Sequence, residues 1–202
     1  MSQKGFFVNV SRCTGCRACT IACADLKNSP IGVYNRTVRE YEGGTWRQNG
    51  KTWTPEVFAY YISLGCNQCS DPACVKVCPT KAHHKRTEDG IVLIDVEKCI
   101  GCGMCAQACP YGAPKLNIST HKMQKCDACV DRTSQGMMPV CVEACPERAI
   151  EFGEIEELRK KHGKVAEIAP LPAASQTQPN IVFELPKNAK PVGFTGGTFN
   201  KF

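Results

Sequence analysis

Sixteen of the 202 residues are cysteine, and their spacing constrains this chain more than any other feature. They form four groups of four, and every group ends in C-x3-C. The first and third groups share the spacing C-x2-C-x2-C-x3-C, the second is C-x2-C-x4-C-x3-C, and the fourth is C-x2-C-x11-C-x3-C. A proline follows the last cysteine of groups two, three and four. In chain order the cysteines are Cys13, Cys16, Cys19, Cys23; Cys66, Cys69, Cys74, Cys78; Cys99, Cys102, Cys105, Cys109; and Cys126, Cys129, Cys141, Cys145.

This spacing is typical of 4Fe–4S sites in bacterial ferredoxins, where three cysteines of a run hold one cluster and the fourth ligates another. Three thiolates on one tight loop can reach three irons of a cubane. A cysteine three residues later has begun a helical turn and points toward a neighbouring cluster. Gly15, Gly101 and Gly103 suit such loops, because glycine tolerates positive φ and close backbone approach. The sequence therefore predicts four 4Fe–4S clusters with four cysteine ligands each.

Three other uses of cysteine fit the spacing less well. Repeated C-x2-C pairs would close strained local disulfide loops, and the chain is longer than the secreted scaffolds that are this rich in cysteine. Structural zinc also uses C-x2-C pairs, but rarely runs of four cysteines that end in Cys-Pro. Sixteen is too large a number for buried free thiols that only fill a core.

The groups alternate in type, which indicates an internal duplication. FVNVSRC at 7–13 aligns without a gap on LIDVEKC at 93–99, an offset of 86 residues. The second group and its flank CPTKA align on the fourth group and CPERA, with seven extra residues before Cys141. We therefore expect two ferredoxin-like modules. Groups one and four build the first from residues 1–35 and 117–163, and groups two and three build the second from residues 63–116.

Short strands and helices fill the segments between the groups, so the expected fold class is α+β. Residues 36–62 alternate apolar and polar side chains around two hairpin signals, Gly43-Gly44 and Asn49-Gly50, and are expected to form a hairpin insertion. Asp89-Gly90 is expected to turn the chain into a short strand at 91–94.

The region after the last cysteine divides into a helix and a tail. Residues 153–163 have acidic residues in the first turn, basic residues in the last and Gly163 at the end, which predicts one amphipathic helix. Five of the thirteen prolines fall between 170 and 191. Residues 164–202 are therefore expected to be an extended tail, either lying on another surface or disordered.

The formal charge of +6 does not indicate a nucleic-acid partner. The basic residues are dispersed and form no stripe interleaved with aromatics. Cluster-bound thiolates carry negative charge that the excess Lys and Arg offset. Arg12, Lys98 and Lys125 each precede the first cysteine of a group, where a cation would favour a reduced cluster; the alternative is a solvated side chain.

No catalytic constellation is visible in the sequence, which lacks phosphate-loop, dinucleotide-binding and nucleophile-elbow motifs. The four histidines are His83, His84, His121 and His162. His83 and His84 follow Cys78 closely and are expected near one cluster, either as a solvated turn or facing a partner or a proton path. We expect an electron carrier and not an enzyme; a metal-sensing regulator is the competing hypothesis, but no DNA-binding helix pair is evident.

With these motifs in hand, the sequence resembles the four-cluster iron–sulfur subunits of the molybdopterin oxidoreductases, and within them the anaerobic dimethyl sulfoxide reductase branch. The stretches that carry the resemblance are GFFVNVSRCTGCRACTIAC, FAYYISLGCNQCSDPACVKVCP, CIGCGMCAQACPYGAP, MQKCDACVDR and CVEACPERAIEFGEIEELRKKHG. They cover most of residues 5–163 and extend beyond the cysteines, which makes the match specific.

The resemblance implies which cysteines share a cluster. The first site takes Cys13, Cys16, Cys19 and Cys145, and the second takes Cys23, Cys126, Cys129 and Cys141. The third site takes Cys66, Cys69, Cys74 and Cys109, and the fourth takes Cys78, Cys99, Cys102 and Cys105. Nitrate reductase relatives have an aromatic residue where Cys102 stands and hold a three-iron cluster there. The cysteine here implies four 4Fe–4S clusters.

The resemblance also implies partners. Similar subunits carry electrons from an integral membrane anchor that oxidises quinol to a molybdopterin catalytic subunit, in a heterotrimer that serves anaerobic respiration. The first site would lie nearest the molybdenum and the fourth nearest the quinol. The terminal oxidant would be dimethyl sulfoxide or a related S- or N-oxide; the alternative is the same electron path in a polysulfide, tetrathionate or formate complex.

The expected location is peripheral on the bacterial cytoplasmic membrane. No apolar run approaches the ~18 residues of a membrane helix, and the opening MSQKGFFVNV lacks the apolar stretch of a signal peptide. We therefore expect association with the membrane through partners, on the periplasmic face after co-export with one of them.

Overall fold

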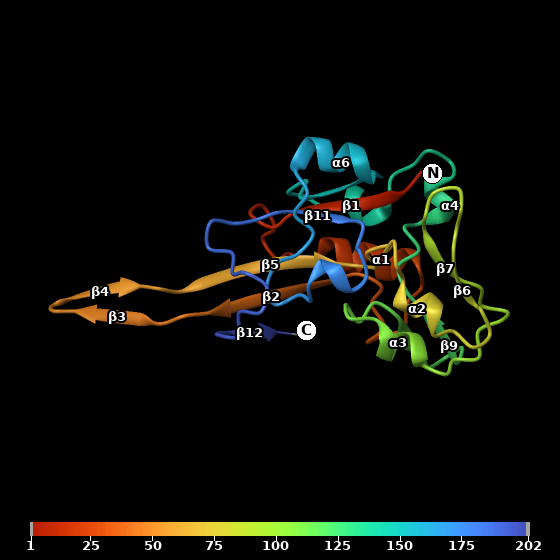
Figure 1. Cartoon of the computed structure of the whole chain (residues 1–202), viewed down its shortest axis with the longest axis horizontal. Coiled ribbons are helices and arrows are strands. Elements are labelled where there is room, and N and C mark those ends of the chain that lie inside the picture. Colours follow the sequence, from red (N-terminus) through yellow and green to blue (C-terminus); the bar gives the residue numbers. More distant parts are fainter. Residues whose placement is uncertain (1, 201–202) are drawn as a thin grey trace.

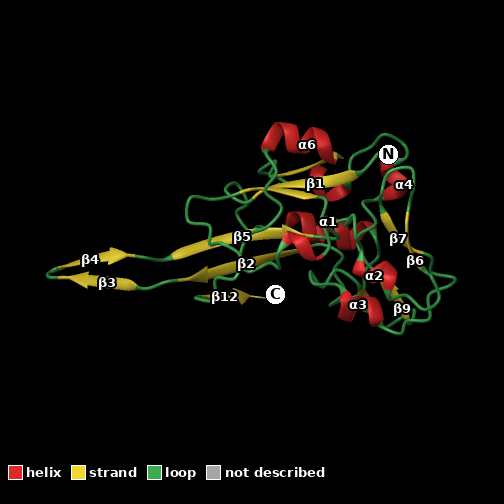
Figure 2. Cartoon of the chain, viewed as in Figure 1, coloured by secondary structure: helices red, strands yellow, loops and turns green. Residues whose placement is uncertain are grey.

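The computed structural model describes residues 2–200 and has the expected α+β character. Figure 1 shows a body of short helices and small sheets from which one long β-ribbon projects. Figure 2 shows that much of the body is loop, with short elements between the loops. Within the described residues, no helix is long and apolar enough to span a membrane.

The cysteine groups lie on short helices and on the loops that precede and follow them. The first group leads into α1 (Ala18–Leu26), the second into α2 (Ala73–Lys76) and the third into α3 (Met104–Ala108). The fourth surrounds α4 (Val130–Thr133) and α5 (Val140–Glu143). Helix α1 packs against α5, and α2 packs against α3. Group one thus meets group four, and group two meets group three.

The main sheet of the body has the strand order β10-β1-β11. The central strand β1 (Lys4–Asn9) is antiparallel to β10 (Ile150–Glu154) and parallel to β11 (Ile181–Glu184). Phe6, Phe7 and Val8 are buried in it. Helix α6 (Ile155–His162) packs on this sheet, and Gly163 follows it at φ +89°. The helix predicted at 153–163 is therefore confirmed except at its start, because Gly153 and Glu154 belong to β10.

The internal duplication is visible in the strand register. Strands β6 (His83–Lys85) and β7 (Val92–Ile94) form an antiparallel pair in which His83 lies opposite Ile94. In the other half, Ile150 lies opposite Val8, and the sequence alignment equates these two pairs of positions. A third small pair joins β8 (Lys115–Asn117) to β9 (Lys122–Gln124). The strand predicted at 91–94 is confirmed within one residue.

The projecting ribbon is built from residues 37–64. Strands β2 (Thr37–Gly43) and β5 (Phe58–Leu64) form its base, and β3 (Trp46–Asn49) and β4 (Thr52–Pro55) form its far end. The base packs into the core, whereas β3 and β4 are exposed along their whole length. Trp46 and Trp53 lie on one face of this exposed end, because Trp46 is opposite Pro55 and Gln48 is opposite Trp53.

Of the two hairpin signals in this segment, only one marks a turn. The tip is at Gly50 and Lys51, between the paired residues Asn49 and Thr52, as Asn49-Gly50 predicts. Gly43-Gly44 instead marks a break between β2 and β3. Gly44 has φ +93°, and a Cβ there would overlap the carbonyl oxygen of Glu56. The glycine is needed for close approach of two strands, and the chain continues outward.

The expectation of an extended or disordered tail at 164–202 is wrong for much of that segment. Strand β11 completes the main sheet, and Ile168, Ala169 and Leu171 are buried in the core. Tyr60 donates its hydroxyl hydrogen to the carbonyl oxygen of Ala169 at 2.7 Å. After a 3₁₀ turn at Ala174–Gln176 and β11, the polypeptide reaches β12 (Gly197–Asn200) on the edge of β2. The free energy gained by burying the tail's apolar residues is sufficient to fold this segment onto the body despite its prolines.

Candidate metal centres

The cysteines predicted to share a site lie together, and each set combines three residues of one group with one from another. Three of the sets line hollows that, counted together with adjoining solvent space, measure about 340, 360 and 270 Å³. In order, these hollows hold the cysteines of the first site (Cys13, Cys16, Cys19, Cys145), the third site (Cys66, Cys69, Cys74, Cys109) and the fourth site (Cys78, Cys99, Cys102, Cys105).

The remaining set belongs to the second site. Its cysteines are buried at the junction of α1, α4 and α5; they are Cys23, Cys126, Cys129 and Cys141. Burial, and then the charges of the neighbouring Cys126 and Cys141 thiolates, raise the pKa of Cys23 to about 12. Burial also raises the pKa of Cys126, and the nearby Cys66 thiolate adds to the rise. The second and third sites are therefore neighbours.

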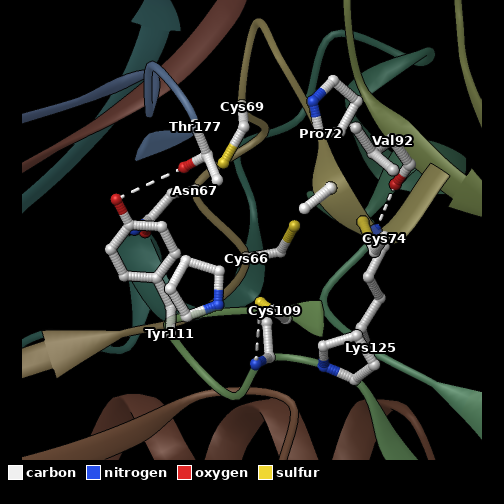
Figure 3. A pocket seen from close by; sticks show the side chains of 14 residues that line it. Cys66, Asn67, Cys69, Pro72, Cys74, Val92, Cys109, Tyr111, Lys125 and Thr177 are labelled. Carbon is white, nitrogen blue, oxygen red and sulfur yellow. Dashed lines mark hydrogen bonds between the residues drawn. The ribbon is translucent and has the colours of Figure 1, made fainter. Parts of the chain in front are cut away.

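Figure 3 shows the third site from close by. The four cysteine side chains point into one space between the loop before α2, α2 itself and the end of α3. Tyr111 and Thr177 close one side, with their hydroxyl oxygens 3.4 Å apart. On the other side the Lys125 ammonium donates to the carbonyl oxygen of Val92. Thr177 belongs to the C-terminal segment, so that segment contributes to the wall of a predicted site.

The sulfurs accept hydrogen bonds from the backbone in a recurring way. Four of these bonds run from Ala149 N–H to Cys145 Sγ at 3.3 Å, Ala113 N–H to Cys109 Sγ at 3.4 Å, Met123 N–H to Cys99 Sγ at 3.4 Å, and His83 N–H to Cys78 Sγ at 3.5 Å. Such donors favour a charged sulfur over a neutral thiol. At Cys78 they outweigh burial and lower the pKa of the thiol. N–H donors of this kind suit cluster-bound thiolates, whose potentials respond to hydrogen bonds at the sulfurs.

The loops before the helices use positive φ at equivalent positions of the two halves. Gly15 has φ +76° and Gly101 has φ +70°. A Cβ on Gly15 would lie 2.6 Å from Cδ1 of Tyr61, and one on Gly101 would overlap the carbonyl oxygen of His121. Glycine at both positions is required by crowding as well as by conformation.

The donor chemistry fits iron–sulfur clusters better than the alternatives. All sixteen cysteines fall within the described residues and are free thiols, not disulfides. In residues 2–200, no three His, Cys, Asp or Glu side chains are grouped to hold a single metal ion. Each predicted site instead offers four sulfurs spread around a space, a suitable donor set for a polynuclear cluster.

Exposure distinguishes two of the sixteen cysteines. Cys16 and Cys102 are exposed, whereas the other fourteen are buried or half-buried. These residues belong to the first and the fourth predicted sites, and the duplication equates their positions. The first and fourth sites thus each have one exposed cysteine, the four cysteines of the second site are all buried, and the third site has two half-buried cysteines, Cys69 and Cys109.

The three cations predicted to lie beside clusters have different surroundings. Lys125 is 6% exposed and lines the third site, where its charge opposes the rise that burial causes in the pKa of Cys74. Lys98 is exposed and pairs with Asp95 at 2.8 Å, and Arg12 is also exposed. A fourth cation, Arg36, is fully buried and was not found by sequence reasoning.

The paired histidines also differ. His83 is 3% exposed and lines the fourth site, and neither ring nitrogen has a hydrogen-bond partner within the described residues. Burial, with a smaller contribution from Lys125, lowers the pKa of His83 to about 4, so the ring is neutral at pH 7. His84 is exposed. The prediction that this pair lies near a cluster site is supported for His83.

Comparison with known proteins agrees with this donor set. A model of the 4Fe–4S dicluster domain matches residues 57–155, and a model of the 4Fe–4S binding domain matches residues 10–28. The B component of anaerobic dimethyl sulfoxide reductase from Escherichia coli is 53% identical over 97% of this chain and 95% of its own length. Its counterpart in Haemophilus influenzae is 48% identical over 98% of this chain and 96% of its own. The B component of tetrathionate reductase from Salmonella typhimurium is 38% identical over 81% of this chain and 62% of its own.

Proposed function

The protein belongs to the family of B components of anaerobic dimethyl sulfoxide reductase, and from that membership we propose the path that its electrons take. It is an iron–sulfur electron-transfer subunit with four 4Fe–4S clusters, and it carries electrons for a partner's catalysis. In our proposal electrons enter from a membrane anchor that oxidises quinol, cross the fourth, third, second and first sites in turn, and leave to a molybdopterin subunit.

The observation that carries this proposal is the order of the sites. The Cys66 thiolate of the third site helps to raise the pKa of Cys126 in the second, and the Cys19 thiolate of the first helps to raise the pKa of Cys141 in the second. In the proposed grouping, Cys105 and Cys109, which lie in and directly after α3, would ligate the fourth and third clusters. The four sites are therefore arranged in series, with an exposed cysteine at each end.

The ligand grouping forms part of the proposal. Four cysteines would hold each cluster as grouped above, and groups one with four and two with three would form the two ferredoxin-like modules. Each cluster, when bound, supplies reversible one-electron chemistry. The contribution of the polypeptide is to position the sulfurs, donate N–H bonds to them and bury the four cysteines of the second site.

The complex is proposed to reduce dimethyl sulfoxide or a related S- or N-oxide. The relatives named for dimethyl sulfoxide reductase support this choice, while the tetrathionate reductase relative keeps the alternative oxidant open. Two partners are proposed, a molybdopterin catalytic subunit and a quinol-oxidising membrane anchor, in a heterotrimer. Through these partners the protein is proposed to attach peripherally to the cytoplasmic membrane, on its periplasmic face.

Reduction of the assembled complex in membranes tests the path. A menaquinol analogue should reduce the cluster signals seen by electron paramagnetic resonance, and addition of dimethyl sulfoxide should reoxidise them. Clusters that dithionite reduces but the quinol analogue does not would contradict the membrane anchor. If the clusters stay reduced after addition of dimethyl sulfoxide but are reoxidised by tetrathionate, the terminal oxidant is tetrathionate and not dimethyl sulfoxide. Reductase activity of the isolated protein would contradict an electron-transfer role.

A further inference from the structure

Arg36 lies directly before β2 and has the largest side chain among those that are fully buried, at 2% exposure. One guanidinium nitrogen donates to Ser63 Oγ at 3.0 Å and to the Ser63 carbonyl oxygen at 3.4 Å. The guanidinium carbon lies 4.8 Å from the centre of the Phe6 ring. Strands β5 and β1 thus fix a permanent positive charge inside the protein.

The groups that face this charge are cysteine sulfurs. Burial alone would lower the pKa of Arg36, but nearby thiolates outweigh it and raise the pKa above its ordinary value; in order of effect they are Cys141, Cys126, Cys19 and Cys23. Arg36 in turn opposes the rise that burial causes in the pKa of Cys126 and of Cys141. Three of these cysteines belong to the second site, and Cys19 belongs to the first.

Ser63 connects the same cation to the first site. Its Oγ lies 3.4 Å from Cys19 Sγ while accepting the hydrogen bond from Arg36. The hydroxyl can therefore donate to the sulfur and accept from the guanidinium at once. Arg36 and Ser63 form a polar bridge between a ligand of one site and the ligands of the next.

The duplication shows that this arrangement has a counterpart. The alignment that equates Cys66 with Cys126 also equates Gly65 with Lys125, the buried cation of the third site. A Cβ on Gly65 would lie 3.4 Å from Nη2 of Arg36 and 3.4 Å from Sγ of Cys126. Lys125, which precedes the fourth cysteine group, supplies the cation of the third site. Its counterpart Gly65, which precedes the second group, has no side chain, and Arg36 brings a cation to the equivalent place beside the second site.

We propose that Arg36, oriented by Ser63, is a positioning residue that serves as the shared counter-cation of the first and second clusters and raises both of their reduction potentials. Each one-electron reduction adds one negative charge to a cluster, and a buried cation stabilises that charge because little water screens it. The guanidinium stays protonated, so the electron arrives without a proton from Arg36. This inference rests on the ligand grouping of the proposed function.

The test is a potentiometric titration of the whole complex in membranes, followed by electron paramagnetic resonance, with iron content measured on every sample. Arg36→Met removes the charge and keeps an unbranched side chain of similar reach. It should lower the equilibrium constant for reduction of the first and second clusters at least tenfold, or ~59 mV for one electron. The third and fourth clusters should change much less. Arg36→Lys should restore most of the loss.

Two further variants serve as controls. Lys125→Met removes the equivalent buried cation and should shift mainly the third cluster. Arg47→Met removes an exposed arginine of β3, which pairs with Glu56, and should shift none of the four. If Arg36→Met lowers the iron content, Ser63→Ala becomes the deciding test. It keeps the Arg36 charge but removes the hydroxyl that orients the guanidinium. That variant should shift the first and second potentials and spare the others.

Unchanged first and second potentials in Arg36→Met at full iron content would overturn the inference and leave Arg36 a packing residue. Equal shifts of all four potentials in Arg36→Met would also overturn it. If Arg36→Met does not retain its clusters, unchanged potentials in Ser63→Ala would overturn it instead. Wild-type complex with fewer than four clusters per polypeptide would instead count against the proposed function.

Discussion

The backbone N–H of Asn9 donates a hydrogen bond to the carbonyl oxygen of Ala149 at 2.8 Å. This bond joins the strand before the first cysteine group to the residue that follows the fourth group by four positions. The other half repeats it between the N–H of Asp95 and the carbonyl oxygen of Ala82, at 2.9 Å. One backbone arrangement thus joins each pair of cysteine groups.

Asn9→Ala is expected to weaken the loop that carries the first site. The Asn9 side-chain oxygen accepts the N–H of Arg12 at 2.9 Å, and Asp95 Oδ1 accepts the N–H of Lys98 in the same role. Loss of this bond should cost about 1 kcal/mol of stability. Asn9→Asp, which copies the other half, should cost much less. Thermal denaturation of both variants measures the difference, and equal losses would count against the shared role.

Deletion of residues 164–202 is expected to destroy the fold. It removes β11, whose Ile181, Val182 and Phe183 are buried, and each such side chain contributes about 1.5–3 kcal/mol. The deletion also removes Thr177 from the wall of the third site. Iron content after purification should fall sharply.

A shorter deletion provides the control. Removal of 196–202 takes away β12, which pairs only with the edge of β2 among the described strands, and should leave cluster content near normal. Intact clusters in the longer deletion would show that the tail is dispensable for the core.

Gly101→Ala and Gly103→Ala form a matched pair on either side of Cys102. Both glycines have positive φ, which costs an alanine about 1–2 kcal/mol. At Gly103 a Cβ would meet open space, whereas at Gly101 it would overlap the carbonyl oxygen of His121. Gly101→Ala should therefore displace the loop and diminish the signal of the fourth cluster, and Gly103→Ala should keep that signal. If the two variants behave alike, crowding at Gly101 is not what selects glycine.

The spacing of the cysteines was sufficient to predict the groups and their loops, because ligand spacing, glycine turns and the following prolines are local features. The helix at 153–163 and the strand at 91–94 were predictable for the same reason. The turn predicted at Gly43-Gly44 is wrong, because the sequence alone does not distinguish a turn glycine from one that lets two strands approach.

The features that sequence reasoning missed depend on contacts between distant segments. Arg36 has no local mark of burial; it becomes an internal cation only when β5 and β1 close around it. The prolines of 164–202 predict an extended tail, whereas Ile181, Val182 and Phe183 form a short apolar run that is consistent with a buried strand. A parallel partner 175 residues away could not be inferred from that run.

Cys102→Ser is expected to interrupt electron entry. Cys102 is exposed and lines the fourth site, so its replacement should cost one iron or leave a harder oxygen ligand. A three-iron cluster has a higher potential, and each ~59 mV changes a one-electron equilibrium tenfold. A shift of a few hundred millivolts, within the range of such clusters, would trap the electron.

The readout separates the two ends of the path. Turnover driven by quinol should collapse, while artificial donors that reach the inner clusters should still support it, and the oxidised variant should show a three-iron signal. Normal quinol turnover together with that signal would place the fourth cluster off the path.

Iron, acid-labile sulfide and zinc measured on the anaerobically purified protein test the central claim most directly. Sixteen free cysteines in four sets should hold about sixteen iron and sixteen sulfide per polypeptide, with zinc near zero. A preparation dominated by zinc, with little labile sulfide, would contradict the four-cluster account.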